Sequence, residues 1–202
     1  MTRGGRISIE RHKKTEHIPL KKTVFLMVEG ESEAVYFNRV ARLTDRYNIR
    51  SKVSRDKKCT DIIKNCAKQG DILGLEEGDL KVAVFDLDVV DETLLREAVS
   101  LAEELDVKIM ASNLSFEFWL LLHLEDTPHV YTQDDYEASL SQLLGRKYIK
   151  TKGLGDRLDL NSIQNAVKRG EKILPDSDPI KCKVISNSSM LWEILKSITK
   201  TE

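Results

Sequence analysis

Three acidic residues follow directly on short apolar runs, where their side chains can act together on a ligand. Glu29 follows residues 23–28 (TVFLMV), and Asp86 and Asp88 follow residues 81–85 (KVAVF). Residues two apart in an extended chain point the same way, so Asp86 and Asp88 can face one metal ion. Hard oxygen ligands without a nearby cysteine or histidine suit Mg²⁺ or Mn²⁺ rather than Zn²⁺. The pattern therefore predicts a divalent metal site, with Glu29 as a third ligand or as a general base.

The elements that position these acids follow an alternating pattern of strands and helices. Short apolar segments indicate strands at residues 23–28, 49–53, 81–85 and 107–111. Helical periodicity predicts helices between them, at residues 32–45, from Thr60 to Gly70, and at residues 91–105. This rhythm predicts an α/β fold with a mostly parallel, four-stranded sheet flanked by helices. Ligands bind beyond the carboxyl ends of such strands, so the three acids are expected to converge at one edge.

The C-terminal third of the chain shows no further alternation of strands and helices. Helices are predicted from Thr132 to Gly145 and at residues 160–174 and 189–198. We therefore divide the chain into a basic arm (1–22), a catalytic core (23–125) and a helical appendage packed on the core (126–202). Residues 147–159, with Gly153 and Gly155, are the segment expected to be most mobile.

Two groups of basic residues stand out in a chain whose net charge is only −1. Residues 1–22 show no periodicity and contain seven basic and two acidic residues, a net charge of 7 − 2 = +5. The second group consists of Arg146, Lys147, Lys150 and Lys152, with Tyr148 among them. Cations can follow a phosphate backbone while an aromatic ring stacks on a base, so this group is a candidate nucleic-acid-binding surface. Each group can equally be an ordinary solvated surface.

Length and composition set the broad class of the protein. The chain has 202 residues, 41% of them hydrophobic and 32% charged, which suits one soluble α/β domain with an appendage. The apolar stretch around Trp119 is far shorter than the roughly 20 residues that cross a bilayer. The N-terminus lacks the apolar region of a secretory signal, so we expect no membrane contact and a cytoplasmic location. Cys59, Cys66 and Cys182, odd in number and widely spaced, are expected to be reduced, partly buried thiols.

Three blocks of the sequence form an ordered set of motifs. The first block is residues 28–33 (VEGESE), followed by Tyr36 and Phe37. The second is residues 84–88 (VFDLD), and the third runs from residues 111–113 (ASN) into residues 116–123 (FEFWLLLH). Together these blocks resemble the RloB family, which is classed with Toprim domains. The resemblance covers residues 23–124 and, more weakly, residues 187–189 with the helix that follows them.

This resemblance implies a Toprim-like fold and a magnesium-dependent nuclease that cuts DNA or RNA in a prokaryotic antiphage or abortive-infection system. It also implies a partner ATPase of the AAA or ABC type that is encoded nearby. The Toprim glutamate of the family falls on Glu29 and its D-x-D pair on Asp86 and Asp88. The sequence departs from the family at Leu114, where proline is expected, and at Val89, where the family often has another acid.

Four further polar residues in these blocks each have a structural and a functional interpretation. Glu117 lies in an otherwise apolar segment, and because a buried charge needs a partner it is a candidate catalytic residue. At the start of a helix it can instead simply favour the helix dipole. Glu31 and Glu33 are better explained as residues that start a helix than as metal ligands. His123 ends the apolar run and is better explained as a core or capping residue than as a catalytic one.

Two other functions remain open from the sequence. The D-x-D at Asp86 also resembles the first motif of haloacid-dehalogenase-like phosphatases, with Ser112, Lys152 and Asp156 in place of later motifs. That class, however, has the motif at the start of its fold and usually followed by Gly-Thr, whereas two valines follow it here. The second alternative is a catalytically silent Toprim-like module that docks onto an ATPase or nucleic acid. Titration with Mg²⁺ or Mn²⁺ would separate this module from an enzyme.

Overall fold

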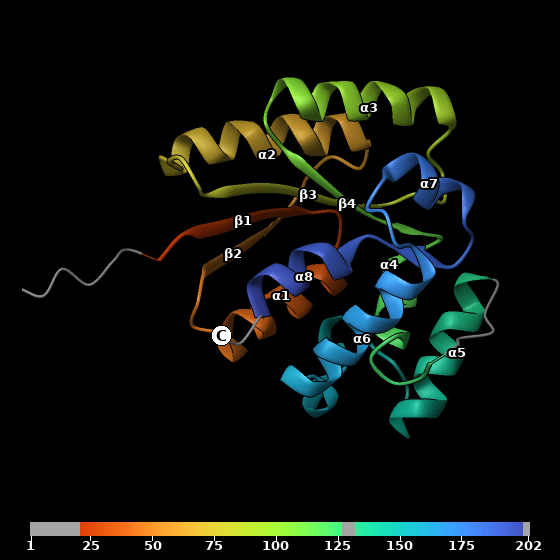
Figure 1. Ribbon diagram of the computed structural model, residues 1–202. Coiled ribbons are helices and arrows are strands. Elements are labelled where there is room, and N and C mark those ends of the chain that lie inside the picture. Colours follow the sequence, from red (N-terminus) through yellow and green to blue (C-terminus); the bar gives the residue numbers. More distant parts are fainter. Residues whose placement is uncertain (1–20, 127–131, 200–202) are drawn as a thin grey trace, which may run out of the picture.

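The computed structural model describes residues 21–126 and 132–199 and shows a five-stranded sheet between two layers of helices (Figure 1). Residues 1–20 of the predicted basic arm and residues 127–131 of the predicted appendage lie outside the described part. The strands are β1 (Thr23–Val28), β2 (Asn48–Val53), β3 (Leu80–Asp86), β4 (Lys108–Asn113) and β5 (Ser188–Ser189). Their order across the sheet is β2-β1-β3-β4-β5. The predicted α/β class and mostly parallel sheet are confirmed.

The strand β5 is the one element by which the sheet exceeds the predicted four strands. It pairs antiparallel with β4, with Ser188 opposite Asn113 and Ser189 opposite Ser112. The other strand pairs are parallel. Two serines carry no apolar run or alternation, so the sequence holds no local signal for this strand. It forms because the chain returns from the C-terminal region to the open edge of β4.

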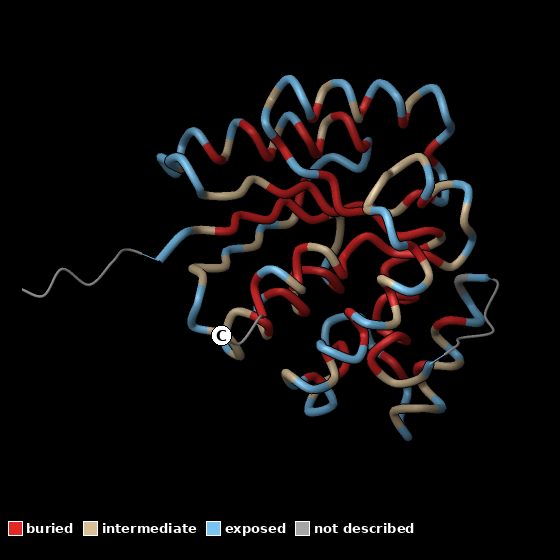
Figure 2. Tube along the Cα trace, in the orientation of Figure 1, coloured by how far each residue is buried: buried red, intermediate tan, exposed pale blue. Residues whose placement is uncertain are grey.

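Helices cover both faces of the sheet and bury a continuous core (Figure 2). On one face lie α2 (Cys59–Leu73) and α3 (Glu92–Glu104), and on the other lie α1 (Glu31–Leu43), α4 (Phe116–Leu121) and α8 (Leu191–Thr199) (Figure 1). The three cysteines are free and buried, as expected. Among the described residues, no helix combines the length and the apolar composition needed to cross a membrane.

Helix α2 is longer at its C-terminal end than the sequence indicates. The predicted end, Gly70, lies inside the helix, where an added Cβ atom would come within 2.8 Å of the side chain of Lys81. The helix ends instead before Gly74, whose φ of 64° is a left-handed conformation that glycine adopts easily. The N-terminal cap residue is Lys58 rather than Thr60. Gly70 is therefore a packing residue and Gly74 is the residue that ends the helix.

The C-terminal region forms helices, as predicted, and also contains shorter elements that were not predicted. Its elements are α5 (Gln133–Leu144), η1 (Lys150–Lys152), η2 (Gly155–Arg157), α6 (Leu160–Ile173), α7 (Pro179–Val184) and α8. Thr132 caps α5 through a reciprocal pair of contacts with Asp135, which confirms the predicted start of that helix. The segment expected to be mobile, residues 147–159, is instead anchored by the buried side chains of Tyr148, Leu154 and Leu158.

Candidate functional site

Glu29 and Asp86 lie side by side at the carboxyl edge of the sheet, as the sequence predicts. β1 and β3 are parallel neighbours, with Val28 opposite Val84. Just beyond this pair, Oε2 of Glu29 accepts a hydrogen bond of 3.1 Å from the backbone N–H of Asp86. The backbone N–H of Glu29 donates to the carbonyl of Val84 at 3.0 Å. The pairing of the two strands thus fixes Glu29 beside Asp86.

Two helices bring further carboxylates to the same edge. The first turn of α1 carries Glu33, and the first turn of α4 carries Glu117. An added Cβ atom at Gly30 would lie 3.1 Å from Oε2 of Glu33, so glycine leaves room for this carboxylate. These side chains border a pocket of about 170 Å³, which we call the acidic pocket. The charged residues that line it are Glu29, Glu31, Glu33, Lys57, Asp86, Glu117 and Lys150.

Asp88 is not brought into the acidic pocket, contrary to the expectation from the D-x-D spacing. β3 ends at Asp86 and residues 88–89 form a turn, so the alternation of an extended chain stops before Asp88. Asp88 is exposed, and its Oδ1 accepts a hydrogen bond of 2.8 Å from the backbone N–H of Val89. Its negative charge still helps to raise the pKa of Asp86. Asp88 therefore acts on the pocket through its charge and does not line it.

Glu117 is buried and held by side chains from two other segments. Its Oε1 accepts a hydrogen bond of 3.2 Å from the hydroxyl of Tyr148 and lies 3.6 Å from Nζ of Lys150. The hydroxyl of Ser32, in α1, donates to the same oxygen at 3.4 Å. Without such partners, burial of a carboxylate charge would cost several kcal/mol. Glu117 therefore has the partners that a buried charge requires.

Burial and mutual repulsion raise the pKa values of carboxyl groups in this pocket. Burial is the main cause that raises the pKa of Glu33 from 4.5 to about 7, and the charges of Glu117 and Glu29 add to the effect. Burial also raises the pKa of Asp86 well above 3.8, with further contributions from Glu33 and Glu29. Lys57 opposes the shift of Glu33. Five acidic residues and two lysines line the pocket, so it concentrates negative charge.

The chemistry of these donors suits a hard divalent cation. Carboxylate oxygens are the ligands that Mg²⁺ and Mn²⁺ prefer, and the lining residues of the acidic pocket offer several. In the described parts of the chain, however, no three acidic, histidine or cysteine side chains form a group that could hold an ion. Burial, with a further contribution from the neighbouring carboxylates, raises the pKa of Asp86, so these groups repel one another when ionised. A divalent cation would offset this repulsion and allow the carboxylates to approach.

The segment predicted to bind nucleic acid packs against the acidic pocket. Tyr148 is only 4% exposed, so its ring is not available to stack on a base, which corrects the prediction. The guanidinium of Arg146 donates to a backbone carbonyl within the same segment at 2.9 Å. Lys150 pairs with carboxylates, whereas Lys147 and Lys152 are exposed. The predicted basic group is therefore divided between structural contacts and free surface.

The polar residues at the end of β4 make structural contacts and do not line the acidic pocket. The hydroxyl of Ser112 lies 2.9 Å from that of Ser189 in the β4–β5 pair. The side-chain amide of Asn113 donates to three backbone carbonyls in and after α7. The peptide bond between Asn113 and Leu114 is cis, at the position where the resemblance led us to expect proline. These residues attach α7 and β5 to the sheet.

His123 is a core residue, as the sequence favours. It is 5% exposed, and its Nδ1 lies 3.0 Å from the carbonyl oxygen of Trp119. Its Nε2 lies 3.1 Å from the hydroxyl of Tyr36. Burial is the main cause that lowers its pKa from 6.5 to about 4, so the ring is neutral at pH 7. Since a carbonyl can only accept, the ring proton is on Nδ1, and Nε2 accepts from Tyr36.

The sequence assigns no role in a site to three charged residues of the acidic pocket, Glu31, Glu33 and Lys57. Glu33 does start a helix, as predicted, but it also lines the pocket. The usable signal is its place four residues after Glu29, across a glycine, where the chain passes from strand to helix. Lys57 lies in the β2–α2 connection, and its Nζ contacts the backbone carbonyl of Glu29. No local pattern in the sequence links Lys57 to Glu29, because the two residues lie 28 positions apart.

Fold and pocket together define an α/β protein whose mostly parallel sheet has a carboxylate-rich pocket at its carboxyl edge. The model of the family described as RloB-like protein matches residues 24–198, most of the chain. The chain therefore belongs to the RloB-like protein family, which confirms the resemblance seen in the sequence. Comparison with curated proteins and with solved structures finds no match.

Proposed function

We propose that this protein is a metal-dependent nuclease that hydrolyses phosphodiester bonds of DNA or RNA with Mg²⁺ or Mn²⁺. The observation that carries the proposal is the acidic pocket, where Glu29, Asp86 and Glu117 meet at the carboxyl edge of the sheet. The resemblance to the RloB family implies this role for Glu29, Asp86 and Asp88, of which Glu29 and Asp86 line the pocket. The resemblance to the RloB family also implies a role in prokaryotic antiphage defence or abortive infection, with an AAA- or ABC-type ATPase as partner.

Three carboxylates are the residues that would hold the metal: Glu29, Asp86 and Glu117. The bound cation would supply Lewis-acid polarisation of a phosphoryl oxygen and a lowered pKa for a coordinated water. Glu29 uses one oxygen on the backbone N–H of Asp86 and keeps the other for a ligand. Glu117 is held in place by the hydroxyl of Tyr148. Both carboxylates are therefore positioned by the fold before any substrate binds.

Two lysines would act on the phosphate, and a carboxyl group with a raised pKa would act on the attacking water. Lys57 and Lys150 line the pocket, and their ammonium groups can contact the non-bridging oxygens of a phosphodiester. Glu33 has a pKa of about 7, and a carboxyl group in this range can both accept and donate a proton near neutral pH. In this proposal a carboxylate oxygen of Glu33 takes a proton from the attacking water.

The geometry gives the phosphatase alternative less support. The residues in place of its later motifs do not line the acidic pocket. Ser112 is bonded to Ser189, and Asp156 forms an ion pair of 3.4 Å with Arg39. Lys152 is exposed in η1. Phosphodiester hydrolysis is therefore the function that this arrangement supports best.

The test is a cleavage assay with the full chain and labelled DNA, RNA and tRNA, in Mg²⁺, Mn²⁺ or EDTA. Each reaction is run with and without an ATPase encoded nearby. Asp86→Asn should lower the cleavage rate on the order of 100-fold, because one of the few groups that stabilise the transition state is lost. Its melting temperature should stay equal or rise, because one of several repelling carboxylates is neutralised. Glu97→Gln, an exposed acid on α3, is the matched control and should change neither quantity.

Three outcomes contradict parts of this proposal. Cleavage that persists in Asp86→Asn would show that the activity belongs to another site or to a contaminant. Loss of cleavage together with a lower melting temperature would make Asp86 a structural residue. If the parent chain cuts no substrate in any reaction, with or without an ATPase, the nuclease proposal is wrong.

A further inference from the structure

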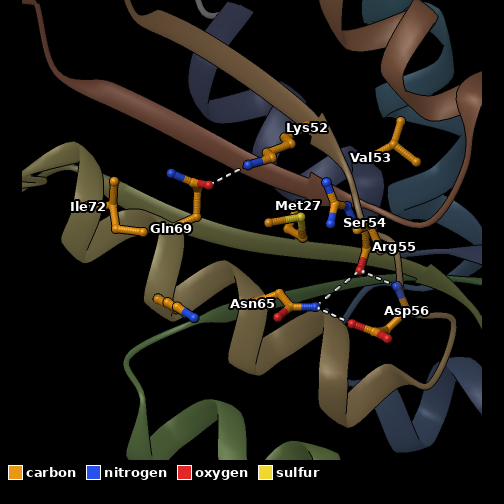
Figure 3. Close-up of a pocket in the computed structure, with 10 residues that line it drawn as sticks. Met27, Lys52, Val53, Ser54, Arg55, Asp56, Asn65, Gln69 and Ile72 are labelled. Atoms are coloured by element: carbon orange, nitrogen blue, oxygen red, sulfur yellow. Dashed lines mark hydrogen bonds between the residues drawn. The ribbon is translucent and has the colours of Figure 1, made fainter.

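A second pocket lies next to the acidic pocket, between the edge strand β2 and helix α2 (Figure 3). It has a volume of about 310 Å³. The charged residues that line it are Lys52, Arg55, Asp56 and Lys68. They come from β2, from the connection that follows it and from α2. We call this pocket the basic groove.

The basic groove concentrates positive charge in a chain that is nearly neutral. Its lining has three basic residues and one acidic residue, a net charge of 3 − 1 = +2. Residues 50–58 (RSKVSRDKK) have five basic and one acidic residue, a net charge of 5 − 1 = +4, compared with −1 for the whole chain. Arg50 and Lys52 are exposed and two apart in β2, so they point to the same side of the sheet. Clustered cations of this kind are what binding to phosphates requires.

The carboxylate of Asp56, which also lines the groove, is hydrogen-bonded to Asn65 and, in the described part of the chain, forms no ion pair with these cations. Nδ2 of Asn65, from α2, donates to Oδ2 of Asp56 at 2.8 Å, and the backbone N–H of Asp56 donates to the hydroxyl of Ser54 at 3.2 Å (Figure 3). Nζ of Lys52 donates to the neutral Oε1 of Gln69 at 2.5 Å. Within the described residues, no ion pair involves any of the three cations of the groove. Their charges are therefore available to an anionic ligand.

Apolar side chains complete the groove beside the cations. Met27 of β1 lies opposite Lys52 in the strand register and is buried. Ile72 of α2 is 68% exposed, although it is a large apolar residue. Apolar surface beside cations suits a ligand that has both phosphates and less polar parts, as the sugars and bases of a nucleic acid do.

The basic groove and the acidic pocket are joined by consecutive residues. Arg55 and Asp56 line the groove, and the next residue, Lys57, lines the acidic pocket and contacts the carbonyl of Glu29. We propose that the basic groove binds the phosphodiester backbone of a nucleic-acid strand and leads it to the acidic pocket. This inference rests on the proposed nuclease function and specifies how the substrate is held.

The basic groove and the segment around Tyr148 are two alternative surfaces for binding the substrate. In that segment Arg146 donates to the backbone of its own segment and Lys150 pairs with Glu117. In the groove the cations come from three different elements and have no acidic partner among the described residues. A nucleic-acid strand can contact several of these cations at once, so it should gain more binding affinity from them than a single phosphate ion does.

The test measures binding separately from cleavage. Fluorescence anisotropy of labelled 25-nucleotide DNA and RNA, single-stranded and duplex, is recorded with the full chain in EDTA at increasing KCl. The groove variant combines Lys52→Gln, Arg55→Gln and Lys68→Gln. The matched control combines Arg157→Gln, Lys168→Gln and Lys172→Gln, which are exposed residues that do not line the groove. Melting temperatures of both variants verify that they fold, and Arg55→Gln alone is a milder variant.

The groove variant should bind on the order of 10- to 100-fold more weakly at about 0.1 M salt. A plot of the logarithm of its binding constant against the logarithm of the salt concentration should be less steep, by about 0.7 to 0.9 in slope for each cation removed, because fewer counterions are released. The control variant should bind as the parent does. The inference is overturned if the groove variant binds normally, or if only replacement of the four basic residues at 146, 147, 150 and 152 weakens binding. It is also overturned if the groove binds inorganic phosphate or a mononucleotide as tightly as an oligonucleotide.

The same measurements keep the two proposals separate. Groove-dependent binding without cleavage in Mg²⁺ or Mn²⁺ would contradict the nuclease function and leave the groove as a nucleic-acid site. Cleavage that is unchanged in the groove variant would contradict the groove and leave the nuclease function intact.

Discussion

Helix α1 contacts α4 and the turn after it at two places, which we call the acidic level and the neutral level. Burial raises the pKa of a carboxyl group at the acidic level and lowers the pKa of a histidine at the neutral level. In the first turns, Glu33 and Glu117 share the acidic pocket, where burial and neighbouring charges raise the pKa of Glu33 to about 7. One turn further along α1, the hydroxyl of Tyr36 lies 3.1 Å from Nε2 of His123. There burial lowers the pKa of the histidine to about 4. The first level gathers like charges, and the second buries a neutral, hydrogen-bonded pair.

This difference identifies the functional level. The hydrogen bonds of the Tyr36–His123 pair are satisfied without any ligand, so core packing explains them fully. The repulsion between Glu33 and its neighbours has no such structural benefit. Strongly perturbed carboxyl groups in a pocket are typical of sites that bind a ligand or carry out chemistry. The comparison predicts that neutralising a carboxylate of the acidic pocket raises stability, whereas removing a hydrogen-bond donor from the neutral pair lowers it.

The largest effect on stability is expected from Glu33→Gln. Folding raises the pKa of Glu33 from 4.5 to about 7. The contribution of Glu33 to the free energy of unfolding is therefore fully present below pH 4.5 and is lost as the pH rises through 7. A shift of this size corresponds to at most about 3 kcal/mol. At pH 8 the free energy of unfolding of the variant should therefore be about 1 to 3 kcal/mol higher than that of the parent. Urea denaturation in EDTA at pH 5 and pH 8 measures the difference.

Two comparisons sharpen this prediction. Glu97→Gln, an exposed acid, should show no such dependence on pH. Added Mg²⁺ should reduce the advantage of Glu33→Gln, because a cation in the pocket would stabilise the ionised carboxylates of the parent. If the variant is less stable than the parent at pH 8 in EDTA, the acidic pocket is not under electrostatic strain and the comparison fails.

The sequence predicts those parts of the molecule that local pattern and sheet geometry determine. The apolar runs before Glu29 and Asp86 fix two buried parallel strands, and neighbouring parallel strands bring the residues at their carboxyl ends to one edge of the sheet. The capping residue Thr132 gives the start of α5. These inferences succeed because each depends on residues close together in the chain or on a general rule for parallel sheets.

The sequence does not predict features that depend on contacts between distant segments. Asp88 misses the pocket because the chain turns directly after Asp86, and the D-x-D spacing does not reveal this turn. Tyr148 lies among exposed cations in the sequence but is buried against α1 and α4. β5 pairs with β4 across about a third of the chain, and Lys57 reaches Glu29 from another connection. Such contacts depend on tertiary packing.

A smaller effect of opposite sign is expected at the neutral level. Tyr36→Phe leaves Nε2 of the buried His123 without its hydroxyl donor and should lower the free energy of unfolding by about 1 to 2 kcal/mol at pH 7. Tyr47→Phe, at a partly exposed tyrosine, is the control and should change little. Folding lowers the pKa of His123 from 6.5 to about 4, so its contribution is present above pH 6.5 and lost as the pH falls toward 4. A Tyr36→Phe variant as stable as the parent would contradict this account.

The smallest effect is expected from Tyr148→Phe, which removes the hydroxyl that donates to Glu117 and keeps the buried ring. Oε1 of Glu117 loses the 3.2 Å hydrogen bond from this hydroxyl but retains Ser32 at 3.4 Å and Lys150 at 3.6 Å. Because two partners remain, the free energy of unfolding should fall by less than about 1 kcal/mol, and by less than in Tyr36→Phe.

Combining Tyr148→Phe with Ser32→Ala tests whether the hydroxyls of these two residues substitute for each other. The two hydroxyls lie 3.3 Å apart and both reach Glu117, so the double variant should lose more stability than the sum of the single variants. Nucleic-acid affinity in EDTA should stay within about twofold of the parent, because neither hydroxyl lies in the basic groove that we propose to supply the phosphate contacts. Strictly additive losses would show that each hydroxyl acts alone. A large loss of nucleic-acid affinity would show that the segment around Tyr148 helps to bind the substrate.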